Sequence, residues 1–291
     1  MLNQLLVNGL VMGSAYALIA IGHTMIFGLM GISNFAHGEL YMLGGFAAYV
    51  VMVQLHLVNY YVGLVLALVI GMGVGALLER LVFRRVRAGD HTTSALVTIG
   101  LSIFLANTVR YIWGADPKII PNPLPSQALH LGSVLITPAR LFIIVISIIS
   151  IFILQVLIQK TKLGKAFRAT FQNRDAALLA GIDVNKIYTA NSAIGSGLAA
   201  MAGALLGVIY TIDPNMGIKA VSIAWIVVTA GGAGSFVGAI LAGYLLGVVE
   251  SFGGGYISSQ YKDAVGFIVL ILVLLIRPQG FFGKARSQMG G

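Results

Sequence analysis

Long runs of apolar residues dominate the sequence, and they restrict the possible folds more than any other feature. The run from Leu141 to Leu154 contains no charged residue and is apolar on every face. Charged residues make up only 9% of the 291 residues, whereas an average soluble domain contains about 25%. So few charges cannot give a body of this size a water-soluble surface. We therefore expect an integral membrane protein.

The apolar runs have the length of membrane-spanning helices, which need about 20 residues. Strands of an outer-membrane barrel would instead alternate polar and apolar residues over about ten positions, and these runs do not. We predict an all-α integral membrane protein, a polytopic helical bundle of eight or nine spans with broken helices, forming one transmembrane domain over residues 1–291. The expected spans are Leu5–Ile26, Glu39–Leu57, Tyr60–Leu81, Ser94–Trp113, Leu141–Gln159, Ile187–Thr211, Val221–Thr229, Phe236–Phe252 and Ala264–Ile276.

Most of the positive charge falls in three segments between these runs. The segments contain Arg80, Arg84, Arg85 and Arg87, then the Lys and Arg residues of 160–186, then Arg277, Lys284 and Arg286. Because cytoplasmic loops are rich in Lys and Arg, we place these segments and the C-terminus in the cytoplasm. The N-terminus, the Pro-rich loop 114–138 and the segment 212–220 are then expected outside. The net charge of +9 thus reports topology, and nucleic acid is not an expected partner.

Two glycine-rich segments, residues 28–39 and 231–238, interrupt the apolar runs. Irregular backbone at membrane depth is tolerated only where protein or a water-filled cavity satisfies its polar groups. Such interruptions in both halves of a transporter point to its pathway, although each could also be a turn at the membrane surface. The pathway candidates are Asn34, His37, Glu39, Gly231, Gly232, Gly234 and Ser235.

Asn34, His37 and Glu39 concentrate polar and ionisable groups at the first interruption. Ionisable residues inside a membrane suggest a function because their burial is costly. Glu39 would equally suit the first turn of a helix, where its charge faces the helix dipole, with Asn34 as a cap. A metal site at His37 is not expected, because no second histidine or carboxylate stands at helical spacing with open access. Catalytic residues and cofactors are not expected either.

The basic segment 160–186 combines positive charge with one apolar face. The apolar residues recur at spacings of 4, 7 and 4, as expected for a short amphipathic helix or pair of helices. They are Phe167, Phe171, Leu178 and Ile182. Such a helix can lie on membrane lipid or insert into a partner protein. Within it, Asp175-Ala-Ala-x-x-x-Gly181 resembles the Glu-Ala-Ala-x-x-x-Gly loop of ABC importer permeases, in which a short helix docks into a cleft of the ATPase.

Six motifs distributed over nearly the whole chain extend this resemblance. The motifs are Gly13–Gly22, Asn34–Met42, Leu163–Ala169, Ala180–Ile182, Gly231–Ser235 and Tyr261–Gly280. In residues and in order they closely resemble the LivH-type permease of branched-chain amino acid ABC importers. The resemblance implies a subunit of the bacterial inner membrane that binds an amino acid substrate. It also implies a second homologous permease, two cytoplasmic ATPase subunits and a periplasmic substrate-binding protein as partners.

The resemblance also implies roles for single residues. The region that couples the permease to the ATPase would contain Arg168, Arg174, Asp175, Ala176, Ala177 and Gly181. The small alanines permit close docking, and Gly181 permits a sharp exit from a helix. Residues 34–39 would form a broken helix near the pathway. Two departures from the pattern concern the docking geometry, since Asp175 replaces Glu and no Leu-Pro pair follows Gly181.

The chain itself is not expected to bind ATP. A phosphate-binding loop needs Gly-x-x-x-x-Gly-Lys-Ser/Thr, whereas Gly164-Lys165 and Gly283-Lys284 are each followed by Ala and lack the leading glycine. We therefore expect a permease that works by alternating access and leaves hydrolysis to its partners. A permease of the same family for urea or other amino acids is an alternative. An ion-coupled secondary carrier is another, but it would need more ionisable residues than His37, Glu39 and Glu250.

Overall fold

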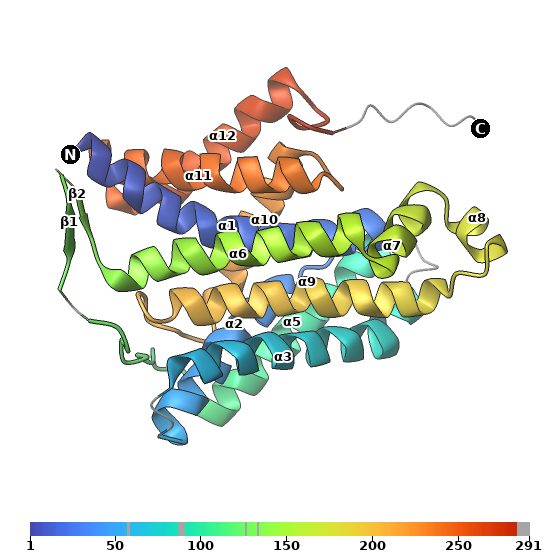
Figure 1. Ribbon diagram of the computed structural model, residues 1–291, viewed down its shortest axis with the longest axis horizontal. Helices are drawn as coiled ribbons and strands as arrows, with labels where there is room; N and C mark the ends of the chain where they lie inside the picture. Colours follow the sequence, from blue (N-terminus) through green and yellow to red (C-terminus); the bar gives the residue numbers. More distant parts are fainter. Residues whose placement is uncertain (57–58, 87–90, 126, 133, 284–291) are drawn as a thin grey trace.

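The computed structural model describes residues 1–56, 59–86, 91–125, 127–132 and 134–283, most of them helical (Figure 1). The long helices are α1 (Leu2–Met30), α3 (Tyr60–Leu78), α5 (His91–Trp113), α6 (Pro138–Lys160), α9 (Val184–Leu206) and α11 (Phe236–Tyr256). The shorter ones are α2 (His37–Tyr49), α4 (Arg84–Val86), α7 (Lys162–Gln172), α8 (Arg174–Leu179), α10 (Met216–Gly231) and α12 (Lys262–Ile276). The other elements are η1 (Val50–Gln54), η2 (Glu79–Phe83), η3 (Ser259–Tyr261) and the antiparallel strands β1 (Leu129–Leu131) and β2 (Val134–Ile136).

Six helices in the described part of the chain are long and apolar enough to cross a membrane. They are Leu2–Met30, Tyr60–Val86, Thr92–Trp113, Pro138–Lys160, Val184–Leu206 and Phe236–Tyr256. The other expected spans correspond to α2, α10 and α12, which have 13, 16 and 15 residues. The first two are short because α2 begins after one glycine-rich interruption and α10 ends at the other. The helical membrane fold is thus confirmed, whereas the number of eight or nine spans is not.

Helices α1 and α9 form the centre of the bundle. Within an 18-residue apolar stretch of each helix, 67% of α1 and 83% of α9 is buried inside the protein, compared with 17% of α5 and 17% of α6. Helix α1 packs along α11 and α9, and α9 also packs against α2 and α3. Gly9 and Gly13 of α1 face Gly243 and Gly247 of α11, where an added Cβ would collide with the opposite backbone. These small residues allow the close backbone packing that stabilises helix pairs in lipid.

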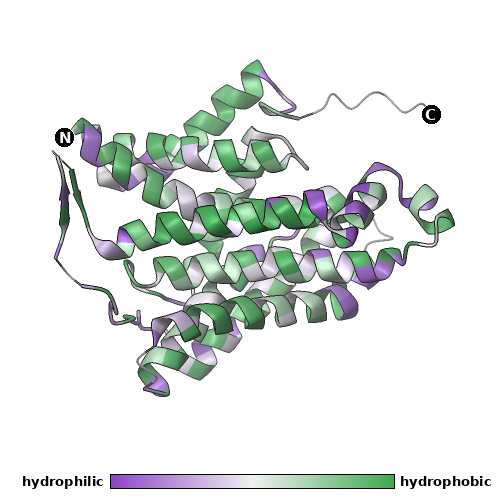
Figure 2. Cartoon of the chain, viewed as in Figure 1, coloured by the Kyte–Doolittle hydropathy of each residue, from purple (hydrophilic) through white to green (hydrophobic). Residues whose placement is uncertain are grey.

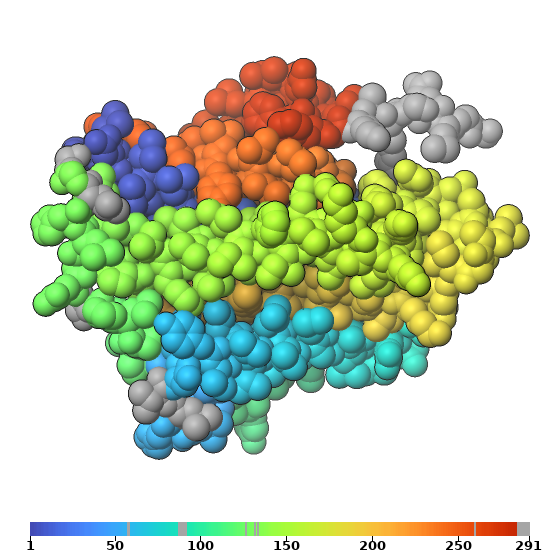
Figure 3. Space-filling model, viewed as in Figure 1, coloured from blue at the N-terminus to red at the C-terminus, as the bar shows by residue number. Residues whose placement is uncertain are grey.

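The basic segments lie together at one end of the bundle, which we call the basic end. Helices α7 and α8 project there, and hydrophilic residues gather around them (Figures 1 and 2). Arg84, after α3, donates to Thr189 Oγ1 near the start of α9 (3.2 Å). On the face shown in Figure 3, α6 runs between α11 and α3 and ends beside α7. Arg87, Lys284 and Arg286 lie outside the described residues.

The loops expected outside lie at the opposite end, which we call the hairpin end because it carries β1 and β2 (Figure 1). Lys118 and Ile212 form an antiparallel bridge between the two predicted external segments, with N–H to O distances of 2.8 and 2.9 Å. The side chain of Gln4 both donates to and accepts from the backbone of Leu135 in β2, at 2.9 Å each. The N-terminus and both predicted external segments thus share one end of the molecule.

Candidate functional site

The first glycine-rich interruption separates α1 from α2 and is held by hydroxyl groups of α5. Gly31 ends α1 in the left-handed conformation, with φ of 67°. Ser94 Oγ accepts a hydrogen bond from the N–H of Ser33 (3.4 Å), and Thr98 Oγ1 accepts one from the N–H of Phe35 (3.1 Å). Thr98 Oγ1 also lies 2.8 Å from the carbonyl oxygen of Ser33, to which it can donate. Protein groups thus satisfy the irregular backbone, as membrane depth requires.

The polar residues of this interruption are buried inside the bundle. Asn34, His37 and Glu39 all have 0% exposure, so other parts of the bundle enclose these three side chains. Asn34 Oδ1 accepts from the N–H of Ala36 (3.1 Å), which stabilises the turn into α2. His37 Nε2 lies 3.0 Å from the carbonyl oxygen of Ile19. Because a carbonyl can only accept, Nε2 is the donor, and this bond ties the start of α2 to the middle of α1.

Glu39 stands in the first turn of α2, as the sequence predicted, and its carboxylate faces α10 and α5. Its Oε1 accepts a hydrogen bond from Ser102 Oγ of α5 (2.9 Å). Its Oε2 has no hydrogen-bond partner within the described ranges. Gly217 of α10 packs directly on the carboxylate, and an added Cβ at that position would collide with it. Gly217 therefore makes the space that Glu39 occupies, and one carboxylate oxygen can still accept a donor.

His23 of α1 and Trp225 of α10 complete a buried polar cluster that sequence reasoning missed. The His23 ring centroid lies 5.1 Å from that of His37 and 4.6 Å from that of Trp225. Both ring nitrogens of His23, Nδ1 of His37 and Nε1 of Trp225 lack hydrogen-bond partners among the described residues. Burying such groups unpaired costs about 1–3 kcal/mol each. Trp225 is half-buried, and we call these three rings together with the nearby break residue Glu39 the buried cluster.

The second interruption joins α10 to α11 and is built mainly from glycine backbone. Gly232 and Gly234 have φ of 98° and 81°, a region that residues with side chains rarely adopt. Ser235 caps α11 by accepting a hydrogen bond from the N–H of Gly238 (3.0 Å). Gly231 and Gly238 are in such close contact that a Cβ on either would collide with the carbonyl of the other. Backbone conformation and close approach thus determine this turn, and residues 231–238 contain no ionisable side chain.

A C-terminal segment after α12 covers the second interruption. The N–H of Phe281 donates to the carbonyl of Ala230 (2.8 Å), and the N–H of Phe282 donates to the carbonyl of Gly231 (3.1 Å). These bonds satisfy carbonyl groups that the end of α10 leaves without helical partners. A Cβ at Gly232 would collide with the backbone of Gly283, so the segment lies directly on the turn.

The two interruptions meet at the basic end, next to α7. A Cβ added at Gly28, in the last turns of α1, would lie 2.8 Å from Gly234 Cα and 3.4 Å from Phe171 Cε2. A Cβ added at Gly234 would lie 3.0 Å from Phe171 Cζ. The ring of Phe171 therefore lies in the corner between the two interruptions. We call Gly28, Gly234 and Phe171 the junction, because it joins α7 to the last turn of α1, just before the first break, and to the second break.

Helix α7 is the amphipathic helix predicted in the basic segment. Phe167 is buried at 5% exposure, and the neighbouring Lys165 is exposed. The Thr161 side chain caps the helix by accepting from the N–H of Gly164 (3.0 Å). The Arg168 guanidinium turns back and donates to the carbonyl of Ile158 at the end of α6. Arg168 thus links α7 to α6. The sequence motif did not predict this contact.

Helix α8 has a defined cap at each end. The Asn173 side chain accepts from the N–H groups of Asp175 (3.0 Å) and Ala176 (2.9 Å). At the other end Gly181 has φ of 78°, and the N–H of Ile182 donates to the carbonyl of Ala177 (3.0 Å). This is the glycine-terminated helix end in which the chain reverses sharply. The sharp exit predicted at Gly181 is confirmed.

The outer surface of α8 exposes both apolar and charged side chains at the extremity of the basic end. Leu178 and Leu179 are 46% and 91% exposed. Arg174 and Asp175 form an ion pair of 3.6 Å, with side chains 57% and 84% exposed. Ala177, by contrast, is only 3% exposed. Among the coupling candidates of α8, the Arg174 and Asp175 side chains are therefore accessible to another protein, and Ala177 faces inward.

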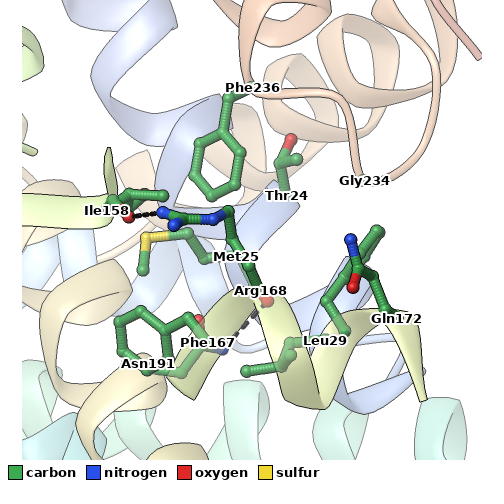
Figure 4. A pocket seen from close by; sticks show the side chains of 11 residues that line it. Thr24, Met25, Leu29, Ile158, Phe167, Arg168, Gln172, Asn191, Gly234 and Phe236 are labelled. Atoms are coloured by element: carbon green, nitrogen blue, oxygen red, sulfur yellow. Dashed lines mark hydrogen bonds between the residues drawn. The ribbon is translucent and has the colours of Figure 1, made fainter. Parts of the chain in front are cut away.

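Two cavities open at the basic end and flank the junction. The first, of about 440 Å³, lies between α7 and α1, and Figure 4 shows Thr24, Arg168, Asn191 and Phe236 around it. The second, of about 610 Å³, is bordered by Phe171 and reaches Trp225 of the buried cluster. Both cavities share Phe171 as a wall. A displacement of α7 would consequently change both cavities and the contact between the two interruptions.

Comparisons with known proteins agree over nearly the whole chain. The family described as "Branched-chain amino acid transport system / permease component" matches residues 5–274. The chain is 38% identical to "High-affinity branched-chain amino acid transport system permease protein BraD" of Pseudomonas aeruginosa, over 98% of this chain and 97% of that protein. It is 35% identical to the LivH protein of the same description from Escherichia coli K12, over 98% and 96%. PsaBC from Streptococcus pneumoniae, solved in complex with Fab, has a similar fold, with TM-score 0.51 and 15% identity over 94% of this chain and 92% of that chain.

Proposed function

Because the chain belongs to the family of branched-chain amino acid transport permease components, we propose that it forms half of the pathway of an ATP-driven importer. The relatives that it matches over nearly their full length are permease proteins of high-affinity branched-chain amino acid transport systems. The substrate is accordingly a branched-chain amino acid. The location that follows is the bacterial inner membrane, with the basic end toward the cytoplasm.

The importer contains four further subunits in this proposal. A second, homologous permease completes the pathway, two ATPases dock at the basic end, and a periplasmic protein delivers the amino acid at the hairpin end. Support for ATPase docking comes from α8, which exposes Leu179, Arg174 and Asp175 at the outermost point of the basic end. The ATPases bind and hydrolyse ATP, and this chain performs no catalysis of its own.

The proposed mechanism rests on the contacts of Phe171 at the junction. Movement of α7 upon ATPase closure would displace Phe171, which lies against both Gly28 and Gly234. The two helix interruptions would then shift together and expose the buried cluster to one side of the membrane at a time. This is alternating access, in which one structural element switches the site between two exposures. The pathway residues are Asn34, His37, Glu39, Gly231, Gly232, Gly234 and Ser235, together with His23 and Trp225.

Deletion of residues 175–181 tests the proposed coupling. Proteoliposomes would contain this chain with the second permease and the ATPases encoded beside it, with ATP inside the vesicles at the ATPase face and the binding protein and radiolabelled leucine on the other face. The intact complex should take up leucine only with ATP, whereas the deletion should abolish uptake and leave basal ATP hydrolysis in place. Normal uptake by the deletion variant would overturn the assignment of α8. ATP-independent uptake driven by an ion gradient would instead identify a secondary carrier.

A further inference from the structure

A cavity at the hairpin end combines both signs of charge with an aliphatic wall. It has a volume of about 250 Å³ and lies between α1, α11 and α12, at the start of α6. Its polar lining includes Asn8, Arg140, Glu250 and Lys262. Small-molecule sites in proteins usually measure about 300–1,000 Å³, so this cavity suits a ligand smaller than a drug. It is distinct from the buried cluster and from both cavities at the basic end.

Glu250 supplies a negative charge from within the bundle. The residue is 1% exposed, and its Oε2 accepts a hydrogen bond from the Tyr16 hydroxyl (2.7 Å) and lies 3.6 Å from Lys262 Nζ. Both partners contact the same carboxylate oxygen, whereas Oε1 lies beside Gly266 of α12, where an added Cβ would come within 3.1 Å of it. A carboxylate at such depth is costly unless it is paired, and intramembrane carboxylates commonly serve a function. An ammonium group is the ligand chemistry that complements it.

Arg140, at the start of α6, supplies a positive charge to the lining of the same cavity. One guanidinium N–H donates to Asn8 Oδ1 (2.7 Å), which orients the group toward the cavity. A guanidinium carries five N–H donors in a planar fork, so this bond leaves others free for a carboxylate in bidentate geometry. Lys262, whose side chain is 25% exposed, adds a second cation beside Glu250.

The rest of the lining includes the apolar side chains of Leu5, Val11, Met12 and Ile209, together with Tyr210 and Ser251. A cation, an anion and an apolar surface around one small volume match the three parts of an aliphatic amino acid. We propose that this cavity is an entry site for the zwitterion, in which Arg140 binds its carboxylate, Glu250 binds its ammonium group, and the apolar wall contacts its branched side chain. The inference rests on the proposed function and assigns residues of this chain to recognition of its substrate.

The position of the cavity fits the start of a pathway. A neighbouring cavity of about 590 Å³ shares Asn8, Arg140 and Ile209 with it and reaches Leu135 of the hairpin. On the inner side, Tyr16 binds Glu250, and His23 belongs to the buried cluster. Tyr16 and His23 are about two helical turns apart and therefore lie on the same face of α1. One face of α1 thus leads from the proposed entry site to the buried cluster.

Binding of L-leucine to the purified full chain tests the site directly. The chain would be placed in nanodiscs of phosphatidylglycerol only, because this lipid has no ammonium group and cannot compete as a zwitterion. Binding would be compared for L-leucine, leucinamide, which lacks the carboxylate, and 4-methylpentanoate, which lacks the ammonium group. Each missing charge should weaken binding by about 10- to 100-fold, the usual effect of losing a hydrogen bond to a charged group.

Arg140→Gln and Glu250→Gln assign each charge to its partner. Arg140→Gln should weaken binding of L-leucine by about 10- to 100-fold and leave binding of leucinamide unchanged. Glu250→Gln should weaken binding of L-leucine by a similar factor and leave binding of 4-methylpentanoate unchanged. Arg110→Gln is the matched control, because Arg110 also donates to an asparagine, Asn215 (2.8 Å), but does not line the cavity. The Arg110→Gln variant should bind L-leucine as tightly as the unaltered chain does.

Two results would overturn the entry site. One is the absence of L-leucine binding by the unaltered chain, and the other is equal weakening of L-leucine and leucinamide by Arg140→Gln. If Glu250→Gln fails to fold, Arg140→Gln and the ligand series still decide the question. The proteoliposome assay of ATP-dependent leucine uptake by the unaltered complex distinguishes failure of the entry site from failure of the proposed importer function. If uptake is normal but the binding results fail, only the entry site is wrong, whereas absence of uptake would overturn the proposed function and the entry site with it.

Discussion

The two helix interruptions of this protein are built in different ways. The first, after α1, buries Asn34, His37 and Glu39 and is held by hydroxyl groups of α5. The second, after α10, contains Gly232 and Gly234 in positive-φ conformations and is covered by the C-terminal segment. The first therefore presents side-chain chemistry, whereas the second depends on backbone shape.

In the proposed mechanism, this difference corresponds to different roles for the two breaks. A polar solute needs hydrogen-bonding groups along its way, and the first break supplies them in the buried cluster. A moving part needs a turn that other segments can contact closely, and glycine backbone at the second break lets Phe171 of α7 and the C-terminal segment approach. In the proposed mechanism, the junction connects the two breaks, so a displacement of α7 would move both the first and the second break.

Gly232→Ala should have the largest effect among substitutions at the two breaks. Gly232 has φ of 98°, and an added Cβ would collide with the backbone of Gly283. Strain from the positive φ alone costs about 1–2 kcal/mol, and the collision adds to it. The melting temperature in detergent should fall markedly, and uptake should be lost.

Gly73→Ala is the matched control, because Gly73 lies within α3 and an added Cβ meets nothing within 4 Å. Alanine there should leave stability unchanged or raise it by about 0.5–1 kcal/mol, since alanine is the better helix former. Equal melting temperatures for the two variants would show that the second break does not depend on glycine.

Thr98→Val tests whether hydroxyl groups hold the first break. Valine has nearly the same shape but leaves the N–H of Phe35 and the carbonyl of Ser33 without the Thr98 hydroxyl. An unsatisfied buried group costs about 1–3 kcal/mol, so the melting temperature should fall. Thr108→Val, on an exposed face of α5, removes a hydroxyl that bonds only within its own helix and should have little effect. A fall of the same size in both variants would contradict the role given to Thr98.

Ser102→Ala should have the smallest effect, and it addresses the chemistry of the first break. Ser102 donates to Glu39 Oε1 (2.9 Å), and its loss should cost about 1 kcal/mol of stability. Because the carboxylate would lose an orienting partner inside the pathway, leucine uptake should fall more than stability does. Ser150→Ala, which removes a hydroxyl of α6 that bonds to the carbonyl of Ile146 and lies 3.7 Å from Met201 Sδ of α9, is the control. Unchanged leucine uptake by Ser102→Ala would contradict the proposal that Glu39 is a pathway residue.

Sequence patterns predicted the features that are local in the chain. Long apolar runs predicted the helices, glycine clusters predicted both breaks, and Gly181 predicted the end of α8, because each depends on neighbouring residues only. The spacing of Phe167 and Phe171 likewise predicted the apolar face of α7.

Features that depend on distant residues could not be predicted in this way. His23 lies within an uninterrupted apolar helix, and only the approach of α2 and α10 places it beside His37 and Trp225. A lone histidine inside an apolar run was the available signal. The predicted number of spans is not confirmed, because α2 and α10, which adjoin the breaks, are shorter than a usual membrane-spanning helix. The roles of the pathway and coupling residues stay predictions.

In the proposed mechanism, Phe171 transmits motion of α7 to both helix breaks. The most direct test is the number of leucine molecules taken up per ATP hydrolysed by the reconstituted complex carrying Phe171→Ala. Phe152→Ala, which alters a side chain 66% exposed on α6, is the control. The ratio should fall about tenfold for Phe171→Ala, corresponding to about 1.4 kcal/mol of coupling, and stay unchanged for the control. An unchanged ratio for Phe171→Ala in a normally folded complex would contradict the claim.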